Sequence, residues 1–171
     1  AHKGICVLII DEINRANLAR VFGELMYLLE YRGETVPLAA GGTLRIPTNV
    51  RILGTMNTAD RSIALEDHAL RRRFAFLPLW PNYDVLRRYH ERANGFSVEP
   101  LIKALQSLNQ AINDLHYQVG VSFFLRPDVE AHLGEIWTQE IEPYLEEYFF
   151  NQSEAVAQYR WARVKQSLGG E

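Results

Sequence analysis

An apolar run that ends in two carboxylates constrains the fold of this chain more than any other feature. Residues 5–10 read Ile-Cys-Val-Leu-Ile-Ile, and Asp11 and Glu12 follow directly. Six apolar and mostly β-branched residues are typical of a strand that is buried on both faces, as in a parallel sheet. The two carboxylates then lie at the carboxyl end of that strand, where open α/β sheets bind their ligands. The segment therefore predicts an α/β fold with a polar site beside its first strand.

Two adjacent carboxylates at a strand end can divide the work of hydrolysing a phosphate ester. Asp11 can hold Mg²⁺ through water while Glu12 polarises the attacking water. This is the Walker B arrangement of P-loop NTPases. A solvated turn is the alternative, in which Asn14 and Asn17 are no more than helix caps. The sequence has no G-x-x-x-x-G-K-[ST] phosphate loop, so it predicts half of such a site.

Composition limits the class of protein and its environment. The 171 residues suit one domain or two small ones, and 47% apolar residues are enough for a core. A net charge of −3 gives no overall basic field for nucleic acid or a membrane surface. The sequence shows no signal peptide and no stretch that could span a bilayer, which predicts no membrane partner. Because the chain opens at Ala1, directly before a core strand, we expect it to be a fragment of a longer protein.

Cysteine and histidine usage predicts neither disulfides nor zinc. The single cysteine, Cys6, excludes a disulfide framework and indicates a reducing compartment, for which we predict the cytoplasm. We expect Cys6 to be buried in the strand and therefore not to act as a nucleophile. The five histidines are scattered without the spacing of metal ligands.

The pattern of the chain changes near residue 80, which divides it into residues 1–80 and 81–171. The first part predicts a helix at Asn17–Glu30, a hairpin with strands at Thr35–Leu38 and Leu44–Pro47, a buried strand at Val50–Met56, a helix at Glu66–Arg72 and a strand at Phe74–Leu79. The second part predicts helices at Val85–Ala93, Val98–Leu115, Val129–Phe149 and Ser153–Ser167. Pro143 should kink or split the third of these helices.

A second polar group follows the second buried strand. Asn57 ends that strand as Asp11 ends the first. If the strands are neighbours, Asn57 lies beside Glu12 and can orient the same water. Asp60 and Arg61 could support Asn57, or Asp60 could pair with Arg15. An Asx-type turn leading into a helix is the alternative.

Three consecutive arginines, Arg71–Arg73, form the third group. One can pair with Glu66 or Asp67, and another can reach across a subunit boundary to a phosphate. An arginine supplied in trans offsets the charge that builds on a transferring phosphoryl group. A solvated charge run, or a contact with nucleic acid or an acidic partner, is the alternative.

The helical part shows less chemistry. Residues 120–124, a glycine-broken junction, are expected to pack rather than to bind a ligand. Four glutamates predict a solvated acidic face, with a partner surface as the alternative: Glu140, Glu142, Glu146 and Glu147.

Order and spacing of these groups resemble an AAA+ ATPase module. More specifically, the chain is similar to the McrB type, the GTP-hydrolysing motors of modified-cytosine restriction systems. The motifs that carry the resemblance are Leu8–Asn17, Val21–Glu24, Met56–Ser62, Ala69–Phe74 and Glu146–Phe150. The resemblance implies a partial α/β P-loop NTPase core, with parallel strands and helices, followed by an all-α helical lid.

The resemblance also implies a role for each matching residue. Asp11 would hold Mg²⁺ through water and contact the nucleotide, and Glu12 would be the catalytic carboxylate. Asn57 would be the sensor that positions the attacking water and contacts the nucleotide. Asp60 and Arg61 would support it.

Further residues would serve a ring of subunits. Arg72 or Arg73 would be the finger supplied in trans, and Asn14 and Arg15 would line the subunit interface. Such rings are hexameric and are stimulated by an McrC-type nuclease subunit. They read modified DNA through a separate N-terminal domain that this sequence lacks. Val121 stands where relatives tend to have a polar or basic residue, so the resemblance assigns no second sensor in the lid.

The resemblance implies Mg²⁺-dependent hydrolysis of GTP, or of ATP, that drives DNA translocation in the complete protein. We expect the present chain alone to be inactive, because it has no phosphate loop. A non-catalytic AAA+-like ring subunit and a MoxR-type chaperone-like ATPase are the alternatives. The motif Met-Asn-Thr-Ala-Asp-Arg-Ser at residues 56–62 argues against the MoxR type.

Overall fold

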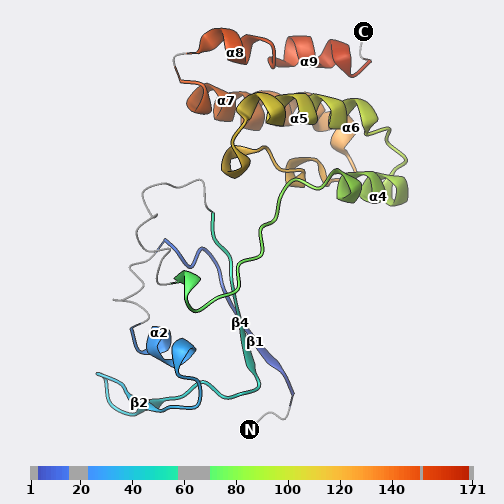
Figure 1. Ribbon diagram of the computed structural model, residues 1–171. Helices are drawn as coiled ribbons and strands as arrows, with labels where there is room; N and C mark the ends of the chain where they lie inside the picture. Colours follow the sequence, from blue (N-terminus) through green and yellow to red (C-terminus); the bar gives the residue numbers. More distant parts are fainter. Residues whose placement is uncertain (1–3, 16–22, 58–69, 151, 170–171) are drawn as a thin grey trace. The chain divides into compact units, whose positions relative to one another are not determined.

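The computed structural model describes residues 4–15, 23–57, 70–150 and 152–169. The chain divides into two compact units, residues 1–77 and 78–171, each of which is described by itself (Figure 1). The division falls three residues before the boundary expected from the sequence.

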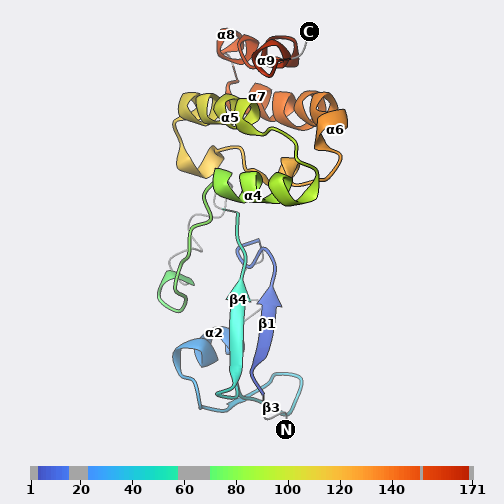
Figure 2. The same ribbon diagram turned by 90° about the vertical axis from the view of Figure 1, so that its right-hand side faces the viewer.

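A two-stranded parallel sheet forms the centre of the first unit. Strand β1 (Cys6–Ile10) pairs with β4 (Val50–Gly54), from Cys6 opposite Val50 to Ile10 opposite Gly54 (Figure 2). Helix α2 (Gly23–Glu30) lies between them in sequence. The parallel pairing confirms the prediction from the two apolar runs.

A short hairpin follows α2. Strands β2 (Val36–Pro37) and β3 (Thr43–Leu44) pair antiparallel, with Val36 opposite Leu44. The hairpin is confirmed, although its strands are shorter than expected. Gly41 and Gly42 adopt positive φ angles of 88° and 85° in its turn, a conformation that glycine adopts without steric cost.

The prediction that both parallel strands are buried is wrong for this chain. Ile5 is 73% exposed and Ile9 is 66% exposed, and Cys6 is exposed as well. The described core of this unit is small and centres on Ile13, Met26 and Leu70. A parallel sheet needs cover on both faces, and two strands with this small core leave most of their apolar side chains in water.

The predicted strand at Phe74–Leu79 is also absent from the described pairings. Residues 75–80 have no regular structure, and Leu77 and Leu79 are highly exposed. A strand exists only where a neighbour completes its hydrogen bonds, so the apolar pattern alone was insufficient. Of the helix expected at Glu66–Arg72, only Leu70 and Arg71 lie in a described helical turn, and residues 58–69 lie outside the described part. The first half of the predicted helix at Asn17–Glu30 also lies outside it.

The second unit is helical around one core. Its α-helices are α4 (Tyr83–Ala93), α5 (Glu99–Ile112), α6 (Val129–Ile136), α7 (Glu142–Tyr148), α8 (Ser153–Ala157) and α9 (Trp161–Ser167). Two 3₁₀ turns, Leu115–Tyr117 and Ser122–Phe124, connect α5 to α6. The leucines and isoleucines of α5 recur along one face, and they are all buried: Leu101, Ile102, Leu105, Leu108 and Ile112.

Trp137 lies at the centre of this core. It is fully buried, and its indole N–H donates to the Tyr159 carbonyl at 2.7 Å. The Phe124 and Trp161 rings both lie 6.4 Å from the Trp137 ring, centroid to centroid. The prediction that the Gly120–Phe124 junction packs rather than binds is consistent with the full burial of Phe124.

Pro143 disturbs the long helix as predicted. Residues Trp137–Ile141 form a π-helical turn between α6 and α7. Proline has no N–H to donate to the preceding turn, and its ring clashes with the carbonyl four residues earlier. The wider π turn lets the chain continue as a helix through this position.

The single helix predicted at Ser153–Ser167 is wrong, because the chain breaks into α8 and α9. Arg160 has extended backbone angles (φ −65°, ψ 144°) at the start of α9. Its guanidinium binds Glu142 at 2.7 Å and Glu146 at 2.5 Å, and the Trp161 backbone N–H donates to Glu142 at 2.7 Å. Two of the four glutamates expected to be a solvated face therefore anchor α9 to α7.

Candidate functional site

The two parallel strands end at a turn that surrounds Thr55. The Thr55 backbone N–H donates to the Ile10 carbonyl at 3.0 Å, and the Thr55 carbonyl accepts from the Ile13 N–H at 2.9 Å. Asp11 and Glu12 therefore both lie opposite Thr55 and are left out of the backbone pairing, as in a β-bulge. The loop presents both carboxylates at the carboxyl ends of β1 and β4, as the sequence predicted.

The Thr55 side chain binds the same loop. Its hydroxyl donates to Asp11 Oδ1 and accepts a hydrogen bond of 3.0 Å from the Glu12 backbone N–H. With its backbone contacts, Thr55 makes four hydrogen bonds to four consecutive residues, 10–13. This residue holds the carboxylate turn in place.

Glu12 has a left-handed backbone, with φ of 49°. This conformation is uncommon for a residue with a side chain, and it occurs often at functional sites. The Glu12 carboxylate pairs with Arg15 at 2.5 Å, but both side chains are substantially exposed. An exposed pair contributes little stability, so it can be exchanged for other partners. Arg15 thus pairs with Glu12, whereas Asp60, its partner in the sequence prediction, lies outside the described residues.

Asn14 joins the first strand end to the second. Its side chain is buried, 3% exposed, and its Nδ2 donates to the Asn57 carbonyl at 3.2 Å. Asn14 Oδ1 is buried and has no hydrogen-bond partner among the described residues. This hydrogen bond therefore joins the segment that contains Asp11 and Glu12 to the segment that contains Asn57.

The described arginines of the cluster have different environments. Arg73 is 21% exposed, donates to the Met26 carbonyl at 3.0 Å and pairs with Glu30 at 2.7 Å, so it fastens the chain to α2. The Arg71 guanidinium lies 4.9 Å from the centre of the Phe76 ring. Arg72 is exposed, and no hydrogen bond or ion pair joins it to another described residue. Arg61 lies outside the described part of the chain.

The chemistry of the turn fits Mg²⁺. The described residues contain no group of three or more His, Cys, Asp or Glu side chains that could enclose a metal ion. Mg²⁺ does not need one, because it is usually held by one or two carboxylates together with water and substrate phosphates. Asp11 supplies one exposed carboxylate, oriented by the Thr55 hydroxyl.

Thr55 is the residue that sequence reasoning missed. It lies in the motif that ends the second strand, where sequence reasoning gave roles to Asn57, Asp60 and Arg61 but none to Thr55. The available signal was the pairing register, because Ile10 lies opposite Gly54 and the next residue of each strand must then be adjacent.

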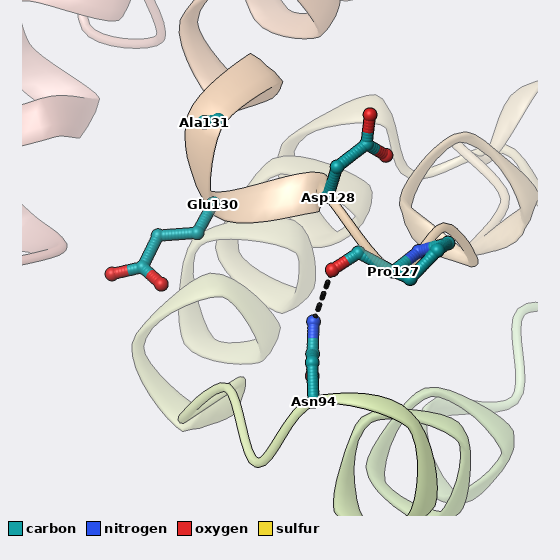
Figure 3. A pocket seen from close by; sticks show the side chains of 5 residues that line it. All are labelled: Asn94, Pro127, Asp128, Glu130 and Ala131. Atoms are coloured by element: carbon teal, nitrogen blue, oxygen red, sulfur yellow. Dashed lines mark hydrogen bonds between the residues drawn. The ribbon is translucent and has the colours of Figure 1, made fainter.

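The second unit has a shallow recess of about 360 Å³ between the end of α4 and the start of α6. Figure 3 shows Asn94 donating to the Pro127 carbonyl across it, at 2.7 Å. On the rim, the Arg126 guanidinium lowers the pKa of Asp128 to about 2 by direct hydrogen bonding. The recess is a shallow surface feature, and two of its acceptors, the Pro127 carbonyl and the Asp128 carboxylate, already have hydrogen-bond partners.

Comparisons with known proteins agree with both units. Residues 1–74 match the AAA domain of the dynein-related subfamily, and residues 100–157 match the alpha-helical lid domain of McrB. No helix in the described parts has the length and apolar character needed to cross a membrane.

Two curated relatives come from restriction systems. The chain is 41% identical over 180 aligned positions to the "Type IV methyl-directed restriction enzyme EcoKMcrB subunit" of Escherichia coli K12. That alignment covers 91% of the chain and 39% of the relative. It is 32% identical over 109 positions to the "Type II restriction enzyme BsuMI component YdiS" of Bacillus subtilis 168, covering 54% of the chain and 30% of the relative. The chain thus spans less than two fifths of the length of either relative.

Proposed function

Because the chain belongs to the McrB-type AAA+ proteins, we propose that it supplies the water-activating half of an NTP hydrolysis site. The observation that carries this proposal is the carboxylate turn, in which Thr55 holds Asp11 and Glu12 while Asn14 ties the same segment to Asn57. In the complete protein, hydrolysis of GTP or of ATP drives DNA translocation for a restriction system.

Each residue of the turn has a role in this reaction. Asp11 would hold Mg²⁺ through water, and the ion would neutralise charge on the phosphates. Glu12 accepts a hydrogen bond from the attacking water and draws its proton away as the water approaches the γ-phosphate. Asn57 orients that water. Mutual placement of these groups supplies most of the catalysis, because phosphoryl transfer needs positioning and charge stabilisation more than covalent chemistry.

The exposed apolar side chains of β1 and β4 are an argument that these strands belong to a larger core in the complete protein. Apolar side chains such as Ile5, Ile9 and Leu53 are stable in a parallel sheet only under cover. Further strands and a phosphate-binding loop provide this cover in our proposal. The present chain alone is accordingly expected to show no appreciable turnover.

We assign the trans-acting finger to Arg72. Arg73 is occupied by the Met26 carbonyl and Glu30, whereas Arg72 is exposed. In the assembled protein, Arg72→Ala should lower kcat about 10³-fold with unchanged folding. Arg73→Ala should instead lower the melting temperature. Equal loss of stability in both variants would contradict the assignment.

The proposed assembly is a ring, a hexamer as in the McrB type, with an McrC-type nuclease subunit as partner. DNA is contacted through domains outside this chain, Arg15 lies toward a neighbouring subunit, and Asp60 and Arg61 support Asn57. The complete protein acts in the cytoplasm.

The proposal is tested in the complete protein by steady-state hydrolysis of GTP and ATP with Mg²⁺. Glu12→Gln should abolish turnover while nucleotide still binds, and Asn57→Ala should lower kcat with little change in nucleotide affinity. Turnover that survives Glu12→Gln would reject the site. If the wild-type complete protein binds no nucleotide, a non-catalytic ring subunit replaces the enzyme as the conclusion.

A further inference from the structure

We propose that Thr55 is a positioning residue, whose hydroxyl fixes the Asp11 and Glu12 carboxylates for hydrolysis. The inference rests on the proposed function, and it goes further by giving a role to a residue outside the groups that we assign to the nucleotide and the attacking water. Thr55 acts through the two carboxylates and not on the substrate itself.

The hydroxyl of Thr55 can do this because it is donor and acceptor at once. It donates to Asp11 Oδ1 and accepts from the Glu12 N–H at 3.0 Å. Asp11 Oδ1 thereby has a partner within the protein, and Oδ2 is the oxygen that would accept a hydrogen bond from the water around Mg²⁺. No aliphatic side chain of the same shape can make either contact.

The contact with Glu12 also holds an unfavourable backbone. Glu12 has a φ of 49°, and its N–H donates to Thr55 Oγ1 in this conformation. Residues with a side chain prefer negative φ. Loss of the hydroxyl therefore frees Glu12 to relax, and its carboxylate then leaves the position from which it contacts the water.

The ends of β1 and β4 are closely packed, so the residues that follow the two strands should move together. A β-carbon on Gly54 would lie 3.1 Å from Ile13 Cγ2, so the side chain of Ile13 occupies the space that glycine leaves open. Two residues after Thr55, the Asn57 carbonyl accepts from Asn14. Hydrogen bonds of Thr55 and Asn14 thus join residues 10–14 to residues 55–57 at two places. A shift of the Asp11 and Glu12 carboxylates would therefore also change their position relative to Asn57.

The test compares Thr55→Val with Thr55→Ser in the complete protein. Valine keeps the branched shape and loses the hydroxyl, whereas serine keeps the hydroxyl. We expect Thr55→Val to lower kcat about 10- to 100-fold, the usual effect of removing a group that orients metal and catalytic ligands. KM for the nucleotide should change less than about threefold, and the Mg²⁺ concentration for half activity should rise. Thr55→Ser should keep most of the wild-type kcat.

A second measurement does not depend on activity. In the 171-residue chain, the HN–Hα coupling and the chemical shifts of Glu12 report its backbone angle by NMR. The left-handed signature should persist in Thr55→Ser and disappear in Thr55→Val. Since Thr55 is exposed, the valine variant should melt within a few degrees of wild type.

The outcomes separate this inference from the proposed function. Wild-type kcat in Thr55→Val, an equal loss in Thr55→Ser, or a left-handed Glu12 in Thr55→Val would each overturn the role of Thr55. If Glu12→Gln abolishes turnover while Thr55→Val is fully active, only the inference fails. If the complete protein hydrolyses no nucleotide, the proposed function fails, and the NMR comparison still decides whether the hydroxyl holds the turn.

Discussion

The two units of this chain bury their apolar side chains to very different degrees. In residues 78–171, helices α5, α6 and α7 surround a closed core that includes Trp137, Phe124 and Leu105. In residues 1–77, the described core cluster contains only Ile13, Met26 and Leu70 with a few partly buried neighbours, and Leu28 and Ile46 are buried outside that cluster. Strand β1 nevertheless consists of apolar residues that face water.

The difference shows that the carboxylate turn, to which we assign the chemistry, and the larger apolar core lie in separate parts of the chain. The carboxylate turn lies in the unit with the small core, so its geometry depends on local hydrogen bonds such as those of Thr55. The helical unit has a much larger set of buried apolar side chains, and some of its polar groups, such as Arg160 and Glu142, join helices. Each of the following experiments tests this division.

Hydrogen exchange should show the largest contrast. Amides of α5 and α7 should exchange at least about 10³-fold more slowly than those of β1 and β4, because exchange protection follows the free energy of local opening. The measurement is exchange with mass spectrometry or NMR on the 171-residue chain. Equal protection of β1 and α5 would show that the first unit is stable without further cover, and that the two units do not differ in stability.

Trp137→Ala should destabilise the helical unit by about 3–5 kcal/mol, because it leaves a cavity and removes the hydrogen bond to Tyr159. Denaturant unfolding followed by circular dichroism measures the change. Trp80→Ala is the control: Trp80 is partly exposed, and we expect its loss to change the free energy of unfolding by less than about 1 kcal/mol. Similar effects of both substitutions would mean that Trp137 is not central to stability.

Much of the fold could be predicted because periodicity reports which elements form. The apolar runs gave the parallel pair β1 and β4, and the helical spacing of Leu101, Leu105 and Leu108 gave α5. The degree of burial could not be predicted, since it depends on what covers the sheet and not on the strand itself. The strand expected at Phe74–Leu79 failed for the same reason.

The candidate site was predictable where a residue type carries the chemistry. Asp11, Glu12 and Asn57 follow from carboxylate and amide side chains at strand ends. The role of Thr55 depends on strand register, and the break before α9 depends on distant glutamates that bind Arg160. Both are tertiary contacts, which local sequence patterns do not encode.

The link between α7 and α9 should have a moderate effect. Arg160→Ala should destabilise the helical unit by about 1 kcal/mol, because Glu142, only 13% exposed, loses its ion-pair partner and keeps only its hydrogen bond from the Trp161 backbone N–H. Glu146→Gln is the matched control, because Glu146 binds the same guanidinium from an exposed position, and its effect should be below about 0.5 kcal/mol. If denaturant unfolding shows the same loss of stability for both variants, the partly buried pair with Glu142 contributes no more than an exposed ion pair.

The smallest expected effect concerns Asp128, the residue directly before α6. The pKa of Asp128 is lowered to about 2 by the Arg126 guanidinium, so the pair stabilises the folded state above the unfolded pKa of about 4. This contribution is lost as the pH falls from about 4 to about 2. An NMR titration should show the low pKa in the wild type and a value near 4 in Arg126→Gln. An unchanged value in that variant would remove Arg126 as the cause.

The left-handed backbone of Glu12 has a consequence for how such a chain can evolve. Glycine at position 12 would adopt the same φ without strain, which for other residues amounts to about 1 kcal/mol. Glu12→Gly should therefore raise stability while it removes the carboxylate to which we assign activation of the water. Laboratory selection for thermal resistance alone would favour this substitution, whereas selection for the proposed hydrolysis would retain a residue that the backbone disfavours.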